Sequence, residues 1–183
     1  MRSGIIMFVG ACCISTGTFA QDAKPLAFPL YPEDVAAEAI LVPAQSPLGF
    51  VSYSREDFVK AVFTGRFTMS GTYEVEVFED GFWVRMWPDK KSRSVLPSWR
   101  QRGGPHEISL SNSSAFAEAV LPEAKLQKLR AGKLSSVRGQ VTIRAERYEA
   151  SIECDAPHFH ARFIYVVKPA VAMAAKPKAV EGC

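Results

Sequence analysis

The feature that most constrains the fold is an alternation of apolar and polar side chains on both sides of a tight turn. From Arg66 to Phe78, Tyr and Val alternate with Glu, and a similar alternation runs from Phe82 to Trp87. Asp80-Gly81 lies between the two runs, and this dipeptide is a strong hairpin-turn signal. Because successive residues of a strand point to opposite faces, the pattern predicts an antiparallel hairpin with one apolar face. A glycine at position 71 predicts a bend or bulge within the first strand.

More strands are predicted in the second half of the chain. Ile108 and Leu110 mark a short strand, and alternation with polar residues predicts two longer ones over residues 137–143 and 148–154. A last strand carries an apolar face made of Phe159, Ala161, Phe163, Tyr165 and Val167. Together with the hairpin, these runs provide enough strands for a sheet with a buried face.

Short helices are predicted at three places within and beside the strand-rich part of the chain. Ser54 and Asp57 suit the start of a helix over about residues 55–63. Ser113 or Ser114 can cap a second helix, residues 115–120, and a third begins at Pro122 and ends near Gly132. Residues 88–105 are expected to form a loop.

This order of elements predicts a mainly β (β-rich α+β) fold. The layout resembles a small antiparallel, OB-like Greek-key barrel with one or two helices, since it has a long bent first strand and a helix between the third and fourth strands. An α+β sheet with helices on one face would explain the same pattern almost as well.

Residues 1–20 have the three parts of a secretion signal peptide. Arg2 supplies the positive start, residues 4–14 form an uncharged apolar stretch, and Thr18-Phe19-Ala20 places small residues before a cleavage site at Gln21. A rival hypothesis is a lipoprotein anchored at Cys12, which follows a loose lipobox. The leader predicts a periplasmic or secreted protein, and no later segment is apolar enough to predict a transmembrane helix.

The mature chain divides into three predicted parts. Residues 21–50 form a Pro/Ala-rich N-terminal segment, with a short helix expected around residues 33–40, and residues 51–168 form a single β-rich domain. Residues 169–183 are expected to be a flexible Ala/Lys/Pro tail.

Two cysteines and a small charge remain after cleavage of the leader. The whole chain has 22 Lys+Arg against 19 Asp+Glu, and loss of Arg2 lowers its net charge of +3 by one. This charge is too small to favour nucleic acid as a partner. Cys154 and Cys183 form an even pair in an oxidising compartment, so we predict a disulfide between them. The alternative is pairing of Cys183 with another chain.

The segment from Trp83 to Arg102 is the strongest candidate for ligand binding. Its indole rings can stack on sugars or bases and its guanidinium groups can bind anions. The candidate ligand-binding residues are Trp83, Arg85, Trp87, Trp99, Arg100 and Arg102. The expected partner is an envelope glycan, a lipid head group or an envelope protein. The alternative is a core tryptophan beside a solvated basic loop.

A weaker hypothesis places zinc or copper at His158 and His160. The two histidines share one strand face, and Cys154 and Asp155 lie nearby in sequence, but Pro157 separates the thiol from the imidazoles. Exposed histidines on a solvated strand are the simpler explanation, and Cys154 has a better partner in Cys183, so we expect no cofactor. His106, beside a Gly-Gly-Pro turn, has a plain loop environment.

The chain contains no nucleophile elbow, zinc-protease helix or phosphate loop. The sequence therefore predicts a non-enzymatic, secreted or periplasmic binding module for an envelope ligand or protein, with a metal-binding envelope protein as the alternative.

Overall fold

The computed structural model describes residues 24–25, 40–55, 59–78, 81–100, 102–154 and 156–177. Over this part of the chain the fold is mainly β, as predicted. The predicted leader, the lipobox cysteine Cys12 and the terminal Cys183 lie outside the described residues, and so do residues 33–39 of the helix expected near the N-terminus.

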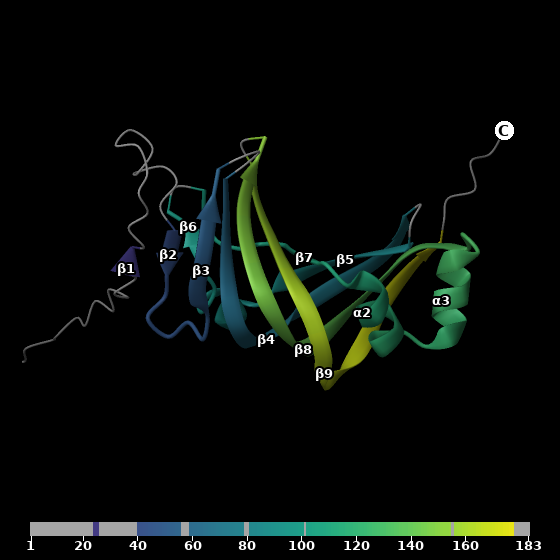
Figure 1. Cartoon of the computed structure of the whole chain (residues 1–183). Helices are drawn as coiled ribbons and strands as arrows, with labels where there is room; N and C mark the ends of the chain where they lie inside the picture. Colours follow the sequence, from purple (N-terminus) through teal and green to yellow (C-terminus); the bar gives the residue numbers. More distant parts are fainter. Residues whose placement is uncertain are drawn as a thin grey trace, which may run out of the picture.

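Six strands form the main sheet, in the order β3-β4-β5-β7-β9-β8. Their bounds are β3 Gly49–Ser54, β4 Val59–Phe78, β5 Gly81–Pro88, β7 Ile108–Leu110, β8 Leu134–Glu153 and β9 Ala156–Pro177. β8 also pairs with β4, so the five strands other than β3 pair in a closed ring (Figure 1). A three-stranded sheet of β1 Lys24–Pro25, β2 Ile40–Val42 and β6 Ser98–Trp99 lies at one end.

The predicted hairpin is confirmed, with β4 and β5 paired from Gly71↔Pro88 to Phe78↔Gly81. Val84 and Met86 of β5 are fully buried, whereas Trp83 is 38% exposed. The alternation in the sequence therefore assigned the two faces of β5 correctly.

The helix predicted over residues 55–63 is wrong where the structure describes it. Val59 to Phe63 belong to β4, and they pair with β3 on one side and β8 on the other. The apolar residues around Phe63 satisfy a strand as well as a helix, and neighbouring strands on both sides supply the backbone hydrogen bonds. Residues 56–58 lie outside the described part of the chain.

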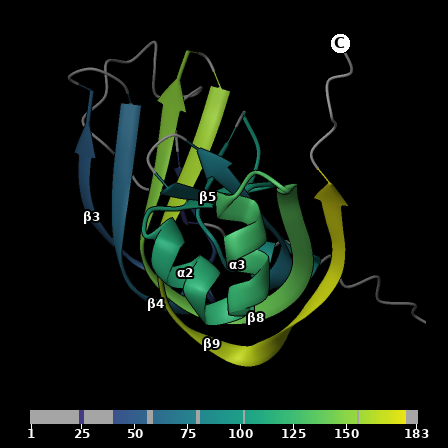
Figure 2. The same ribbon diagram turned by 90° about the vertical axis from the view of Figure 1, so that its right-hand side faces the viewer.

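Helices α2 (Ser113–Val120) and α3 (Glu123–Arg130) form between β7 and β8, close to their predicted places, and α1 (Lys90–Arg93) interrupts the predicted loop. Figure 2 shows α2 and α3 in front of the curved strands, at one end of the ring. Phe116 of α2 packs edge-on against both Tyr73 and Phe163, with ring centroids 5.4 Å apart in each pair. These aromatic contacts join the helices to the core.

The folded region extends beyond the predicted boundaries at both ends. Ile40 and Leu48 of the predicted N-terminal segment are buried in the core. β9 continues to Pro177 and pairs with β8 through several register shifts, so the flexible tail predicted from residue 169 is wrong up to that point. Backbone pairing with β8 orders these residues without needing an apolar face.

The predicted apolar face of the last strand is confirmed for Phe159, Ala161 and Phe163 but not for its end. Tyr165 is 53% exposed and Val167 is 45% exposed. The register between β8 and β9 shifts around these two residues, and each shift of one residue reverses which side chains point inward.

Candidate functional site

An aromatic strip lies on the outward face of β5. It consists of Trp83, Arg85 and Trp87, which alternate with the buried residues of the same strand. The Arg85 guanidinium carbon lies 4.6 Å from the ring centroid of Trp83 and 5.5 Å from that of Trp87. Arg85 thus stacks between the two indoles and holds them in place by cation–π contacts.

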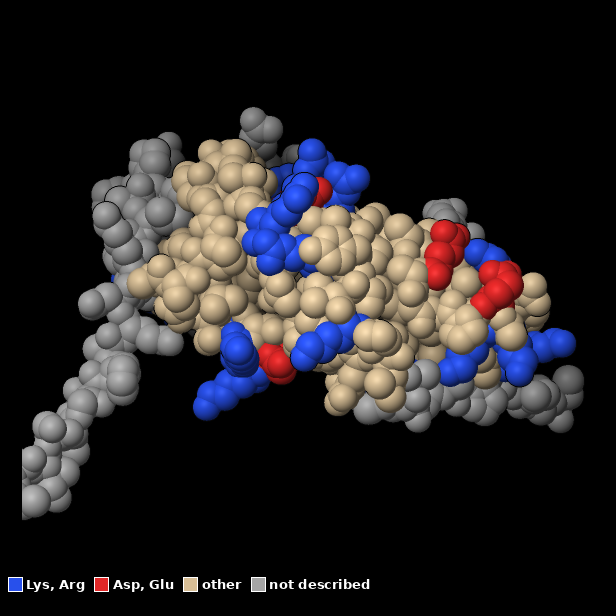
Figure 3. All heavy atoms as spheres, turned by 90° about the horizontal axis from the view of Figure 1, so that it is seen from below, with Lys and Arg blue, Asp and Glu red and all other residues tan. Residues whose placement is uncertain are grey.

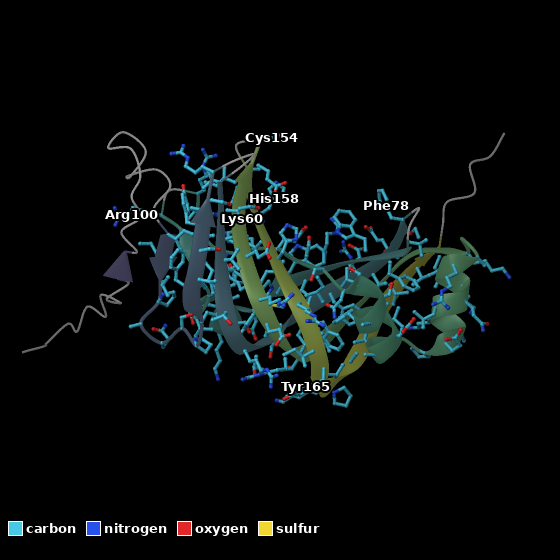
Figure 4. The ribbon with its side chains drawn as sticks, viewed as in Figure 1. Lys60, Phe78, Arg100, Cys154, His158 and Tyr165 are labelled. Atoms are coloured by element: carbon cyan, nitrogen blue, oxygen red, sulfur yellow. The ribbon has the colours of Figure 1, made fainter. Side chains whose placement is uncertain are left out.

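The strip extends to the tip of the β4–β5 hairpin. Phe78 is 65% exposed and meets Trp83 edge-on at 5.9 Å. Figure 4 places Phe78 at the upper right of the molecule. Three aromatic rings therefore follow one another along the outer face of the hairpin.

Arg85 of the strip and the neighbouring Arg138 form ion pairs with acidic residues of the protein itself. Arg85 lies 3.0 Å from the carboxylate of Glu76, 3.5 Å from that of Glu74 and 4.0 Å from that of Glu107. Arg138 of β8 donates to Glu74 at 2.7 Å and lies 5.4 Å from the Trp87 ring centroid. Two guanidinium groups thus face three carboxylates.

Glu74 is the buried centre of this network. The hydrogen bond from Arg138 is the main cause that lowers the pKa of Glu74, and it outweighs the opposite effect of burial. The same hydrogen bond raises the pKa of Arg138. Both groups therefore stay charged at neutral pH and form an ion pair with one another.

A groove of about 370 Å³ adjoins Trp87. Its walls come from β4, β5, β8 and β9, and its polar side chains include Thr72, Asp89, Gln140 and Lys168. Asp89 also accepts a hydrogen bond from the backbone N–H of Ser92, 2.7 Å away, at the start of α1. The groove therefore offers hydroxyl, amide, ammonium and carboxylate groups beside an indole ring.

The remaining candidates of the Trp/Arg segment lie elsewhere. Trp99 is 1% exposed and belongs to the core, so its predicted place on a binding surface is wrong. Arg100 follows β6, at the opposite end of the molecule from Phe78 in Figure 4. Arg102 lies in the same turn, because Trp99 and Gly103 bond to one another across it. The six predicted residues therefore do not form one surface.

His158 and His160 do share the outward face of β9, as predicted. Their partners across β8 are Ser151 and Glu149. Within the described residues, no group of three or more His, Cys, Asp and Glu side chains is arranged to hold a metal ion. His106 lies apart from them and its Nδ1 is 2.8 Å from Arg93.

Cys154 is an exposed, free thiol at the turn between β8 and β9. Pro177 pairs with Leu134, at the other end of the twenty-residue β8. The six residues from there to Cys183 span at most about 22 Å. The predicted bond between Cys154 and Cys183 would therefore require the last part of β9 to leave the sheet.

Comparisons with protein-family models, with curated proteins and with solved structures find no match to this chain. None of the helices in the described part of the chain has both the length and the apolar character needed to cross a membrane.

Glu74 and Arg138 are the important residues that the sequence analysis missed. In the sequence, Glu74 is simply one of the polar residues that alternate with Tyr and Val in the first predicted strand. The hairpin register identifies it: Phe78 pairs with Gly81, and this places Glu74 directly opposite Arg85. A two-residue turn at Asp80-Gly81, which the sequence favours, would have paired Glu74 with Trp87 instead. No local pattern identifies Arg138, because it lies 64 residues after Glu74 in the sequence and contacts it only in the folded protein.

Proposed function

We propose that this protein is a non-enzymatic, extracytoplasmic binding module for an envelope glycan, and that an uncharged stretch of sugar binds along the aromatic strip and into the adjoining groove. The observation that carries the proposal is the row of Trp83 and Trp87 on the outer face of β5, ending at the groove of about 370 Å³. Flat indole rings suit the apolar faces of sugar rings, and the groove supplies polar partners for hydroxyl groups.

The charge balance favours an uncharged ligand. Arg85 and Arg138 are held by Glu74, Glu76 and Glu107, so neither guanidinium is available to neutralise a polyanion. An anionic glycan would also approach three carboxylates. The same balance disfavours nucleic acid, whose binding depends on free cationic groups along the phosphate backbone.

The position of the strip in the fold adds support by analogy. In OB-type layouts the face of the second and third strands binds oligosaccharides or oligonucleotides. Here β5 and β7 are the second and third strands of the ring, counted from β4. This is an argument from layout alone, so the residues of the strip carry the proposal.

The binding test uses the mature chain, residues 21–183, with purified peptidoglycan in a pelleting assay and N-acetylglucosamine oligomers in a tryptophan-emission titration. Trp87→Ala should weaken binding by about 5- to 150-fold, because one stacked ring contributes about 1–3 kcal/mol. Arg100→Ala is the matched control and should bind like the wild type, since Arg100 belongs neither to the aromatic strip nor to the lining of the groove.

Binding of an uncharged sugar should change little between about 50 and 500 mM salt. A steep loss with salt would contradict the uncharged ligand, and equal binding by Trp87→Ala would contradict the site. Failure of both probes to bind the wild type would reject the proposal.

Export is tested separately, by N-terminal sequencing of the protein from its native host. The mature chain should begin at Gln21, directly after the small residue of the cleavage site. A chain that begins at a lipid-modified Cys12 would replace this with a membrane-anchored protein.

A further inference from the structure

A second groove lies between β4 and β8, at a place where the register of β8 shifts against both of its neighbouring strands. The register of β8 shifts against β4 between Phe63 and Arg66, and against β9 between Glu146 and Glu149. Arg147 lies at this double irregularity with φ of 51°. This left-handed conformation suits glycine and is costly for an arginine.

The side chain of Arg147 has no interaction that would explain its presence there. It is exposed, and it makes no hydrogen bond, ion pair or ring contact with the described residues. It lines a groove of about 320 Å³ together with Thr64, Gly65, Arg66 and Glu146. A strained backbone that presents an unpaired functional group is typical of binding sites.

The acidic residue in this groove is already compensated. Glu146 lies 3.6 Å from Arg66 on one neighbouring strand and 3.5 Å from Arg162 on the other. The groove itself is lined by two arginines, Arg66 and Arg147, and one carboxylate, Glu146, so its lining carries one positive charge in excess. Seen from below, Lys and Arg side chains gather across the middle of the molecule, where β4, β8 and β9 run, with few acidic groups among them (Figure 3).

We infer that this groove binds a phosphate group, with Arg147 and Arg66 as its cationic ligands and the Thr64 hydroxyl as a further donor. Guanidinium groups bind tetrahedral oxyanions through paired, charge-assisted hydrogen bonds, and the flat donor fork of arginine suits them better than the ammonium of lysine. This site shares no residue with the aromatic strip or its groove. It can therefore bind its ligand whether or not the glycan proposal holds.

The test is a titration of the mature chain with inorganic phosphate replacing chloride at constant ionic strength, followed by amide NMR shifts. Saturable shifts are expected at residues 64–66 and 146–147. Arg147→Gly relieves the strained backbone and should weaken phosphate binding about tenfold, the loss expected for one charge-assisted partner. Arg147→Gln keeps the side-chain length without the charge and should lose a similar factor. Arg100→Gln, an exposed arginine elsewhere, is the control and should bind phosphate normally.

A second arm distinguishes the sources of the phosphate group. Co-sedimentation with phosphatidylglycerol vesicles that depends on Arg147 would assign the site to a lipid head group. Phosphate binding without vesicle binding would assign it to a soluble phosphate. Wild-type protein that does not discriminate phosphate from chloride, or an Arg147→Gln protein that binds phosphate like the wild type, overturns the inference.

Discussion

The carboxylate of Glu74 and the guanidinium of Arg138 lie 2.7 Å apart, and Glu74 is only 2% exposed. The two residues face one another across the β4–β8 pair. Glu74 also lies beside Arg85 of β5, so one buried carboxylate connects three strands of the ring. Because both arginines stack on Trp87, this ion pair also positions the aromatic strip.

Glu74→Gln should lower the free energy of unfolding at pH 7 by about 1–3 kcal/mol, since it removes a charged hydrogen-bond acceptor from a buried place. The pKa of Glu74 is lowered by folding. Its charge therefore stabilises the fold fully above the pKa of an unfolded glutamate, about 4.3, and this contribution is lost as the pH falls through the lower folded value.

The difference in stability between wild type and Glu74→Gln should thus shrink on acidification. Urea denaturation at neutral pH and near pH 3 measures it. Glu76→Gln is the matched control, because Glu76 also contacts Arg85 but is 29% exposed, and it should cost less. A difference that stays constant with pH would show that the lost stability does not come from the charge of Glu74.

Trp99→Ala should destabilise the protein by about 3–5 kcal/mol, the usual cost of emptying a buried aromatic site. Trp83→Ala, which removes a partly exposed ring from the aromatic strip, should cost less than about 1.5 kcal/mol. Chemical denaturation of the two variants side by side tests the assignment. Similar losses would mean that Trp99 is not the core residue of the pair.

Gly71→Ala should destabilise the protein by more than about 2 kcal/mol, because the added methyl group would overlap the Trp87 carbonyl oxygen and lie 2.9 Å from the Cα of Pro88. The obstacle is backbone, so it cannot rotate away. Gly104→Ala is the control, since its nearest contact is the Cβ of Ser98 at 3.7 Å. Thermal denaturation compares the two, and equal melting temperatures would contradict the close approach of β4 and β5 at Gly71.

Cys154 should react with a maleimide in the non-reduced monomer, because its thiol is exposed and Pro177 lies at the far end of β8. Mass spectrometry of the labelled protein gives the result. A monomer that is labelled only after reduction would support the internal disulfide with Cys183. That bond would close a loop of about 30 residues and contribute about 3.6 kcal/mol in the chain-entropy model.

Local patterns in the sequence predicted the β4–β5 hairpin, helices α2 and α3, and the opposite faces of β5. These features depend on contacts between near neighbours, such as the tight connection between Phe78 and Gly81 and the alternation on either side of it. The placement of Trp83, Arg85 and Trp87 on one outward face follows from this alternation alone. The sequence alone therefore predicted the aromatic strip, but not the ion pairs or the groove beside it.

Pairing between distant strands decided the rest. Residues 59–63 became part of β4 because β3 and β8 pair with them on both sides, although their own pattern also suits a helix. Trp99 entered the core, and Arg138 reached Glu74 from another strand. The sequence by itself determined which residues alternate and where the chain turns. Only the tertiary structure decided which alternating strands pair. The reason is that backbone hydrogen bonds between strands are the same for every residue type, so the sequence of one strand does not specify its partner strand.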